Sequence, residues 1–472
     1  MARISNLPSE LLEAVALECS DTKSLRLTNR HIYAAVEHVL WKTRRVNLYL
    51  DSRGLSEGSI QMLEDFKTGC KGSESIRMLH ITSPDSYHAL GHSKLSDSDL
   101  LSAAIRAMRG LRSVEWRMRW KGLRSTLPLP DSVVFDALSF LPLLQELNLW
   151  CRSIPSFSFD QLHGGQLKKL TIFGEPTAHH DLLSSLSQWL ASNPQLSDLR
   201  LTWTHVIGIS PPSLLPFSTL FDVPLAYTLS LRNLDLTRWI FDFDHPSVTR
   251  HLRNLQSLDL ALCEYDDKGL WKFLSAEQIS LRRIRVQKIS SEMFDYLESI
   301  AQSGVEELLL TEFPEPSGSQ ELARRFYEHV LPRHCRTLRT LCIEPASRLR
   351  EWLVGTNDAN TPIICTELTE LTVGLHCENG DDRLQLLMSF ILNLTDNVPR
   401  LEHLILALPA PSVFDLDADF VLDGMIQSLK LPSKMLVPAF DISVLPWLFK
   451  PYLARVTEDG VVFRMDKLVL EG

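Results

Sequence analysis

The sequence predicts an α/β fold, a solenoid of stacked repeats with a parallel sheet on its concave face and helices outside, preceded by a small all-α module. Three observations predict it. The pattern L-x-x-L-x-L, with Ile, Val or Trp at some apolar positions, recurs twelve times. Segments with helical spacing of apolar residues lie between the copies, and about the first 45 residues have helical spacing alone.

The twelve copies of the motif define the repeat array. They begin at Ile76, Leu111, Leu144, Leu167, Leu196, Leu231, Leu255, Leu281, Val305, Leu338, Leu368 and Leu401. Successive copies start 23 to 35 residues apart, and this period with an L-x-x-L-x-L core is typical of leucine-rich repeats. We therefore assign residues 46–406 to about twelve irregular repeats. The pattern weakens over residues 407–472, which we interpret as an irregular C-terminal repeat or cap.

The elements follow from the spacing of apolar residues. Val46-Asn47-Leu48 predicts a strand that extends the sheet toward the N-terminal module. Amphipathic helices are predicted over 181–190, 292–300 and 384–394, outside the sheet. The longest repeats should carry insertions, for which the candidates are 84–94, 119–131 and the Pro- and Ser-rich segment 208–224.

Composition restricts the class of partner. The 472 residues are 44% hydrophobic and carry a net charge of −10 without a basic tail, so nucleic acid and anionic membranes are not expected partners. The eight cysteines form no C-x-x-C pair and predict reduced thiols in a cytoplasmic or nuclear protein. No secretion signal or membrane-spanning apolar stretch is expected.

Residues 1–45 predict a compact set of short helices. Pro8 suits a first helical turn, and Leu11, Leu12, Val15 and Cys19 follow helical spacing. A module this small has surplus apolar surface, so it must bury that surface against something else.

Three segments of this module resemble an F-box. They are Leu-Pro-Ser-Glu-Leu-Leu at 7–12, Ser-Leu-Arg-Leu-Thr-Asn-Arg at 24–30 and Val-Leu-Trp-Lys at 39–42. An F-box followed by leucine-rich repeats is a recurring layout, in which the F-box docks on the Skp adaptor of a cullin–RING ubiquitin ligase and the repeats hold a protein substrate. The resemblance implies that the adaptor contacts are Leu7, Pro8, Leu11, Leu12, Leu25 and Leu27. The alternative is a helical cap that only covers the first repeat.

The expected substrate surface is the concave face of the sheet. Alternate residues of a strand point to opposite faces, so the leucines of each motif point into the core and the positions between them point outward. Interface hot spots favour Trp, Tyr and Arg. The best candidate patch therefore consists of Arg117, Trp150, Phe173 and Arg200 on four successive repeats. The alternative is that these positions are merely solvated.

No catalytic constellation is present in the sequence. It contains no phosphate-binding loop, no G-x-G-x-x-G after a strand, no H-E-x-x-H and no G-x-S-x-G. We therefore expect no enzyme activity, no metal site and no cofactor. The leading hypothesis is a non-catalytic substrate receptor of an SCF-type ubiquitin ligase. The second is a leucine-rich-repeat scaffold or inhibitor that acts without a ligase.

Overall fold

The computed structural model divides the chain into two compact units, residues 1–253 (unit 1) and 254–472 (unit 2). The structure describes residues 11–12, 45–51, 54–68, 73–82, 95–118, 136–151, 159, 162, 166–174, 179–203, 214–221, 227–300, 304–311, 319–344, 352, 364–374, 389–394, 397–407, 430–431, 441–445, 450–457 and 460–465.

Each copy of the motif forms a strand that begins two residues after the first residue of the copy. All twelve first residues are buried. The second and third apolar residues of the copy are also buried, because alternation in the strand places both on the same side. The twelve strands are β3 (Met78–Thr82), β4 (Ser113–Met118), β5 (Glu146–Cys151), β6 (Lys169–Gly174), β7 (Asp198–Trp203), β9 (Asn233–Thr237), β11 (Ser257–Ala261), β12 (Arg283–Val286), β13 (Glu307–Thr311), β14 (Thr340–Glu344), β15 (Glu370–Gly374) and β16 (His403–Ala407).

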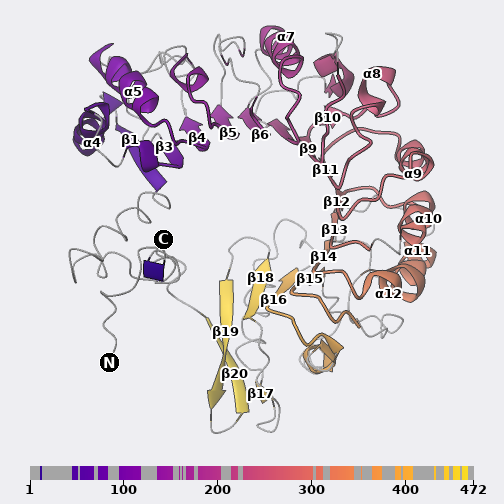
Figure 1. Ribbon diagram of the computed structural model, residues 1–472. Helices are drawn as coiled ribbons and strands as arrows, with labels where there is room; N and C mark the ends of the chain where they lie inside the picture. Colours follow the sequence, from indigo (N-terminus) through magenta and orange to yellow (C-terminus); the bar gives the residue numbers. More distant parts are fainter. Residues whose placement is uncertain are drawn as a thin grey trace, which may run out of the picture. The chain divides into compact units, whose positions relative to one another are not determined.

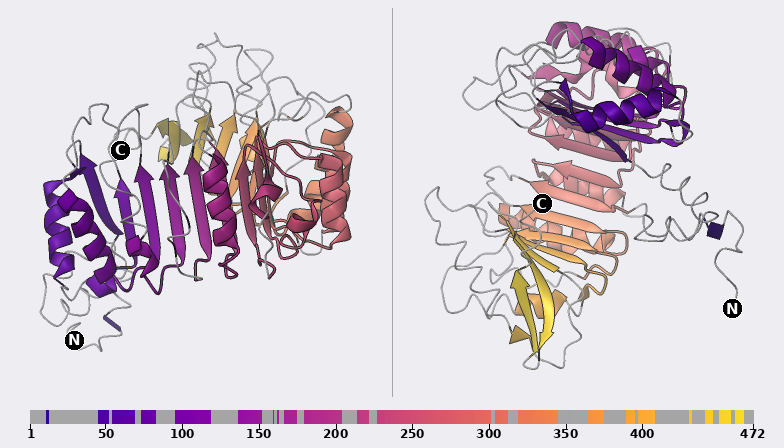
Figure 2. Two further views of the ribbon diagram at one scale, coloured as in Figure 1. Left: turned by 90° about the horizontal axis from the view of Figure 1, so that it is seen from above. Right: turned by 90° about the vertical axis from the view of Figure 1, so that its left-hand side faces the viewer.

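The sheet of unit 1 is parallel and follows the order of the chain. β1 (Arg45–Asp51) pairs in parallel with β3, which confirms the strand predicted at 46–48. The parallel ladder continues through β4, β5, β6 and β7 to β9, and the arrows point the same way in Figure 2. Among the described strands of this sheet, only the short β2 (Gly54–Leu55) runs antiparallel, beside β1.

Helices cover one face of this sheet (Figure 1). They are α4 (Glu57–Lys67), α5 (Leu95–Ala107), α7 (His179–Leu190) and the single turn α8 (Pro246–Thr249), and residues 136–139 form another turn. α4 begins where the hydroxyl of Ser56 accepts the backbone N–H of Ser59 at 3.3 Å, which satisfies one free donor of the first turn. α7 confirms the helix predicted over 181–190. We call the opposite face of each sheet, which no described helix covers, the open face.

Unit 2 repeats this arrangement. β11 to β16 are parallel and sequential, and β18 (Asp441–Leu445) continues the ladder from β16. Helices α9 (Asp267–Ala276), α10 (Ser291–Ser299), α11 (Ser319–Arg325) and α12 (Leu331–His334) lie on one side of it (Figure 1). α10 confirms the helix predicted over 292–300, and residues 389–394 are helical as expected. The final strands β19 (Lys450–Thr457), β20 (Gly460–Met465) and β17 (Lys430–Leu431) pair antiparallel.

A π-helix, Phe326–Val330, joins α11 to α12. Pro332 stands within the first turn of α12. Proline has no backbone N–H, so it cannot donate to the carbonyl of Glu328, four residues earlier, and the helix loosens at that point. The widened turn buries Phe326, which packs against Trp352 with ring centroids 5.6 Å apart.

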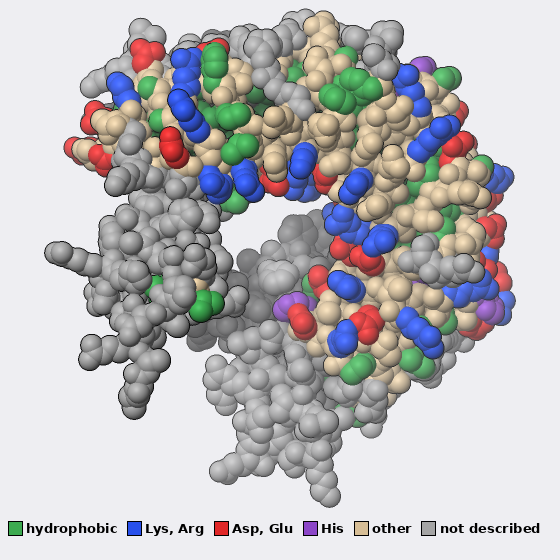
Figure 3. Space-filling model, viewed as in Figure 1, with side chains coloured by type: hydrophobic (Ala, Val, Ile, Leu, Met, Phe, Trp, Pro, Cys, Tyr) green, Lys and Arg blue, Asp and Glu red, His purple; other side chains and the backbone are tan. Residues whose placement is uncertain are grey.

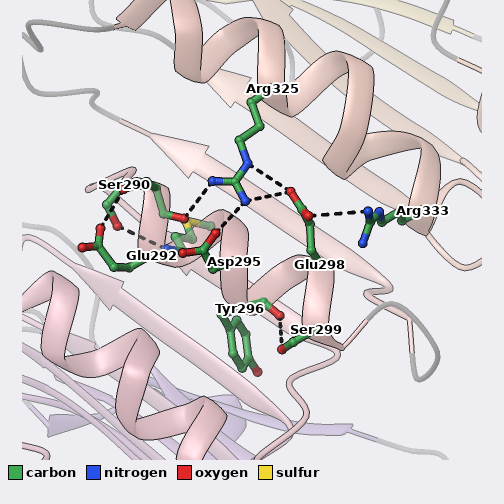
Figure 4. Close-up of polar contacts among 10 residues, drawn as sticks. Ser290, Glu292, Asp295, Tyr296, Glu298, Ser299, Arg325 and Arg333 are labelled. Atoms are coloured by element: carbon green, nitrogen blue, oxygen red, sulfur yellow. Dashed lines mark hydrogen bonds and ion pairs between the residues drawn. The ribbon is translucent and has the colours of Figure 1, made fainter.

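A cluster of ion pairs ties α10 to the helices that follow it (Figure 4). Nη2 of Arg325 lies 2.7 Å from Asp295 and 2.8 Å from Glu298. The same guanidinium lies over the ring of Phe294, 5.8 Å from its centroid, and Glu298 also pairs with Arg333 at 3.5 Å. Arg325 therefore links α11 to α10, which ends at Ser299, well before α11 begins at Ser319.

The change Arg325→Ala should lower the free energy of unfolding by about 1.5 kcal/mol, because two charge-assisted contacts between helices are lost. Only 25% of the Arg325 side chain is exposed, so water replaces these contacts poorly. The matched control is Arg324→Ala, since Arg324 is 57% exposed and, among the described residues, forms its ion pairs with Glu321 and Glu328 of its own helical segment. We expect no measurable effect there. Urea unfolding followed by circular dichroism measures both, and equal effects would contradict the assignment.

Candidate functional site

The open face of unit 1 carries its outward side chains in rows, with one residue from each strand in each row. The register of the parallel strands sets these rows, because paired residues of neighbouring strands point to the same face. The middle row contains His80, Glu115, Asn148, Thr171, Arg200 and Asp235. The C-terminal row, nearer the ends of the strands, contains Arg117, Trp150, Phe173, Thr202 and Thr237.

Each of the four residues of the predicted patch contacts its neighbour in the patch. The rings of Trp150 and Phe173 are stacked, with centroids 3.9 Å apart and an interplanar angle of 28°. The guanidinium of Arg117 lies over Trp150 at 4.6 Å, and that of Arg200 lies over Phe173 at 5.0 Å. The order is therefore Arg, Trp, Phe, Arg across β4 to β7. We call these four residues the Arg–aromatic stack.

Carboxylates in the middle row hold both ends of the stack. Nε of Arg117 pairs with Glu115, which also lies 3.6 Å from His80. Nε of Arg200 pairs with Asp235 at 2.7 Å. Figure 3 shows blue and red side chains together along the open side of these strands. Both guanidinium groups are thus oriented by a carboxylate on one side and by an aromatic ring on another.

His80 and Asp235 belong to this surface but not to the predicted patch. Each lies four residues after the first residue of its copy of the motif, as Glu115 and Arg200 do in theirs. Aligning the copies therefore locates both residues on the open face. The alignment does not predict the ion pairs on this surface, because they depend on the side-chain conformations that bring each carboxylate to a neighbour.

Contacts within this chain hold the side chains of the stack in place in the absence of a partner. An aromatic pair contributes about 0.5–1.5 kcal/mol beyond its buried area, and a cation over a ring at an exposed site contributes roughly 0.5–1 kcal/mol. Trp150 and Phe173 remain partly exposed. A partner that binds to the stack would therefore meet side chains that have already lost much of their rotational freedom, which lowers the entropic cost of binding.

The open face of unit 2 has a different character. Its middle row runs Asp259, Arg285, Leu309, Cys342, Thr372 and Ile405. Arg285 pairs with Asp259 at 3.5 Å, and no aromatic ring belongs to this row. Cys342 and Thr372 are only 7% and 4% exposed although they point to the open face. The middle row of unit 2 therefore consists of one ion pair at its end followed by four uncharged residues.

Most of the predicted adaptor contacts lie outside the described residues. Of the six, the structure describes Leu11 and Leu12, which are helical. Leu11 is 52% exposed and Leu12 is buried. Leu7, Pro8, Leu25 and Leu27 fall outside the described ranges, so the adaptor surface predicted from the sequence stays a prediction.

Several buried titratable side chains satisfy backbone groups where a turn enters a strand. Nδ1 of His334 accepts the N–H of Val305 at 3.2 Å while its Nε2 faces the carbonyl of Leu297, and burial lowers the pKa of this imidazole. The hydroxyl of Tyr296 accepts the N–H of Leu281 and donates to the carbonyl of Ile279, both at 2.9 Å. These groups are fully occupied by the fold.

Neither a metal site nor a membrane span is found where the structure can be described. No three His, Cys, Asp or Glu residues in those ranges are placed to hold a metal ion, and none of the described helices is long and apolar enough to cross a bilayer. No protein-family model matches this chain, and no curated protein gives a significant match. The fold is a repetitive parallel α/β array like that of leucine-rich repeats, and the Arg–aromatic stack lies on the open face of its unit 1.

Proposed function

We propose that this protein is a non-catalytic substrate-recognition subunit of an SCF-type cullin–RING ubiquitin ligase. In this proposal residues 1–45 bind the Skp adaptor and the open face of the repeats binds a protein substrate. The Arg–aromatic stack carries the binding half of the proposal. It presents two partly exposed aromatic residues and two guanidinium groups on four adjacent strands, and these residue types dominate the energetics of protein interfaces.

The ligase half of the proposal depends on the sequence of the N-terminal module. Segments 7–12 and 24–30 resemble an F-box, and Leu11 is an exposed leucine of the kind that anchors a helix in an apolar groove. A receptor of this kind needs no cofactor, because the chemistry belongs to other subunits. It would act in the cytoplasm or the nucleus, where the ligase components are.

Substituting alanine for Leu7, Pro8 and Leu11 together should abolish co-purification with the Skp adaptor, because three apolar anchors of the helix are removed. The control is Trp150→Ala, which should leave adaptor binding unchanged since Trp150 lies on the open face of the repeats. Both variants are measured by pull-down with purified adaptor. Failure of the unaltered chain to bind the adaptor would refute the ligase role.

Deletion of residues 1–45 separates the ligase receptor from a leucine-rich-repeat scaffold or inhibitor. The receptor hypothesis expects the truncated chain to keep its protein partner but to cause that partner to accumulate in cells. A scaffold or inhibitor that acts without a ligase would leave the partner's abundance unchanged. The proteins that accumulate after the deletion are then the candidate substrates.

A further inference from the structure

Both rings of the Arg–aromatic stack are partly exposed, and each lies between two other members of the stack. Trp150 has Phe173 against one ring face and Arg117 against the other. Phe173 is enclosed in the same way, between Trp150 and Arg200. The edge of an aromatic ring carries the positive part of its quadrupole, whereas the face is negative. The accessible surface of the stack is therefore two positive ring edges between two cations.

Both guanidinium-bearing side chains of the stack are partly exposed, 31% for Arg117 and 47% for Arg200. Among the described contacts, Glu115 meets Arg117 through Nε and Asp235 meets Arg200 through Nε. The two terminal amino groups of a guanidinium form a planar fork that matches a carboxylate. Asp235 and Glu115 lie in the middle row, and no Asp or Glu occupies the C-terminal row from β4 to β9. The described residues of the C-terminal row therefore place no negative charge beside the two guanidinium groups.

The dimensions of the stack match an extended peptide. Arg117 and Arg200 lie on strands that are three spacings apart, which is roughly 14 Å. An extended chain advances about 3.4 Å per residue and turns alternate side chains to the same face, so residues i and i+4 are also about 14 Å apart. Residue i+2 then faces the ring edges. An aromatic side chain there places its negative face on them, in the edge-to-face arrangement that aromatic pairs prefer.

We propose that the Arg–aromatic stack binds an extended segment of a protein partner with the pattern acidic-x-aromatic-x-acidic. One carboxylate pairs with Arg117, the other pairs with Arg200, and the aromatic residue between them lies on the edges of Trp150 and Phe173. This proposal rests on the proposed function, since it names the segment of the substrate that the repeats recognise.

The arrangement favours a peptide over single-stranded nucleic acid. Nucleic-acid sites also combine arginine with aromatic residues, but their bases stack on open ring faces. Here both faces of each ring are covered. The chain also carries a net charge of −10, which opposes a polyanion, whereas two local guanidinium groups suffice for two carboxylates.

The test is fluorescence anisotropy with the full chain and a labelled peptide, Gly-Ser-Glu-Ser-Phe-Ser-Glu-Ser-Gly. We expect saturable binding. Replacing both Glu by Gln, or Phe by Ala, should weaken binding at least about tenfold, because the two charge-assisted pairs or the ring contact are lost. A peptide with the two Glu residues adjacent should also bind about tenfold more weakly. A labelled oligothymidine of similar length is the competing probe and should not bind.

Variants of the protein localise the binding. Arg117→Gln and Arg200→Gln should each weaken binding about tenfold, and Arg200→Lys should fall between Arg200→Gln and the unaltered chain, since Lys keeps the charge without the fork. The matched control is Arg285→Gln. Arg285 is 44% exposed and Arg200 is 47% exposed, and each pairs with an aspartate of a neighbouring strand, but no ring lies beside Arg285 in its row. Arg285→Gln should therefore bind the peptide normally.

Several results would overturn the proposal: no binding at millimolar peptide, equal binding of the Gln peptide, equal effects of Arg200→Gln and Arg285→Gln, or preference for the oligothymidine. The adaptor pull-down distinguishes this failure from failure of the proposed function. If the chain binds the adaptor but not the peptide, only the proposed peptide motif is refuted. If the chain binds the peptide but not the adaptor, the ligase role is refuted and the peptide motif is supported.

Discussion

Replacing Gly304 with alanine is expected to lower the free energy of unfolding by about 3 kcal/mol. Gly304 follows α10, where its N–H donates to the carbonyl of Ile300 at 3.1 Å and its φ is +70°. A residue with a Cβ pays about 1–2 kcal/mol for this backbone conformation. The added Cβ would also lie 2.4 Å from Oγ1 and 2.5 Å from Cγ2 of Thr337. Overpacking of this kind costs roughly 1–3 kcal/mol.

Thr337 cannot move away without a further loss. Its hydroxyl donates to the carbonyl of Val305 at 2.9 Å, at the point where the chain enters β13. The control is Gly58→Ala in α4, where no atom lies within 4 Å of an added Cβ. That change should raise the free energy of unfolding by up to about 1 kcal/mol, since alanine favours a helix over glycine. Urea unfolding of both variants tests the pair. If Gly304→Ala matches the unaltered chain, the steric argument is wrong.

The strands of this fold are predictable because each strand is specified by the few residues of its own motif copy. In every copy of the motif the apolar residues alternate with polar ones, and alternation alone decides which side chains enter the core. Residues 217–221 show where this fails. They form a short helix in which Phe217 and Phe221 are buried, but the Pro- and Ser-rich neighbourhood predicts a loop insertion. Contact with other parts of unit 1, and not local composition, stabilises this turn.

The sequence allows each residue of the stack to be assigned to a row of the open face, but it does not predict every side-chain contact within the stack. Arg117, Trp150 and Phe173 each lie six residues after the start of a motif copy, so parallel register places them side by side. Arg200 lies four residues after the start of its copy, in the middle row. Its guanidinium reaches the ring of Phe173 only through the conformation of a long side chain. Such a conformation depends on Asp235 in the next strand, which spacing alone does not reveal.

Acidification from neutral pH to pH 4 should remove roughly 3 kcal/mol of stability through one residue, His251. The imidazole is fully buried, its Nδ1 accepts the N–H of Leu229 at 2.9 Å, and the ring of Phe221 stacks on it at 4.7 Å. Burial, and secondly the positive charge of Arg250, lower the pKa of His251 to about 4. In the unfolded chain the pKa of a histidine is about 6.5. The unfolded chain therefore takes up the proton first, and acid favours unfolding.

The stabilisation is complete above about pH 6.5 and is lost progressively as the pH falls toward 4, because the folded pKa lies below the unfolded one. Urea unfolding at about pH 7.5, 5.5 and 4.5 measures this loss. Acidic side chains also titrate over part of this range, so the informative quantity is the difference between the unaltered chain and His251→Gln. Glutamine offers an acceptor to Leu229 but binds no proton. The variant should be less stable at pH 7.5 and should lose less stability on acidification. Parallel curves for the two proteins would show that His251 has the same pKa in the folded and the unfolded chain, and would contradict the assignment.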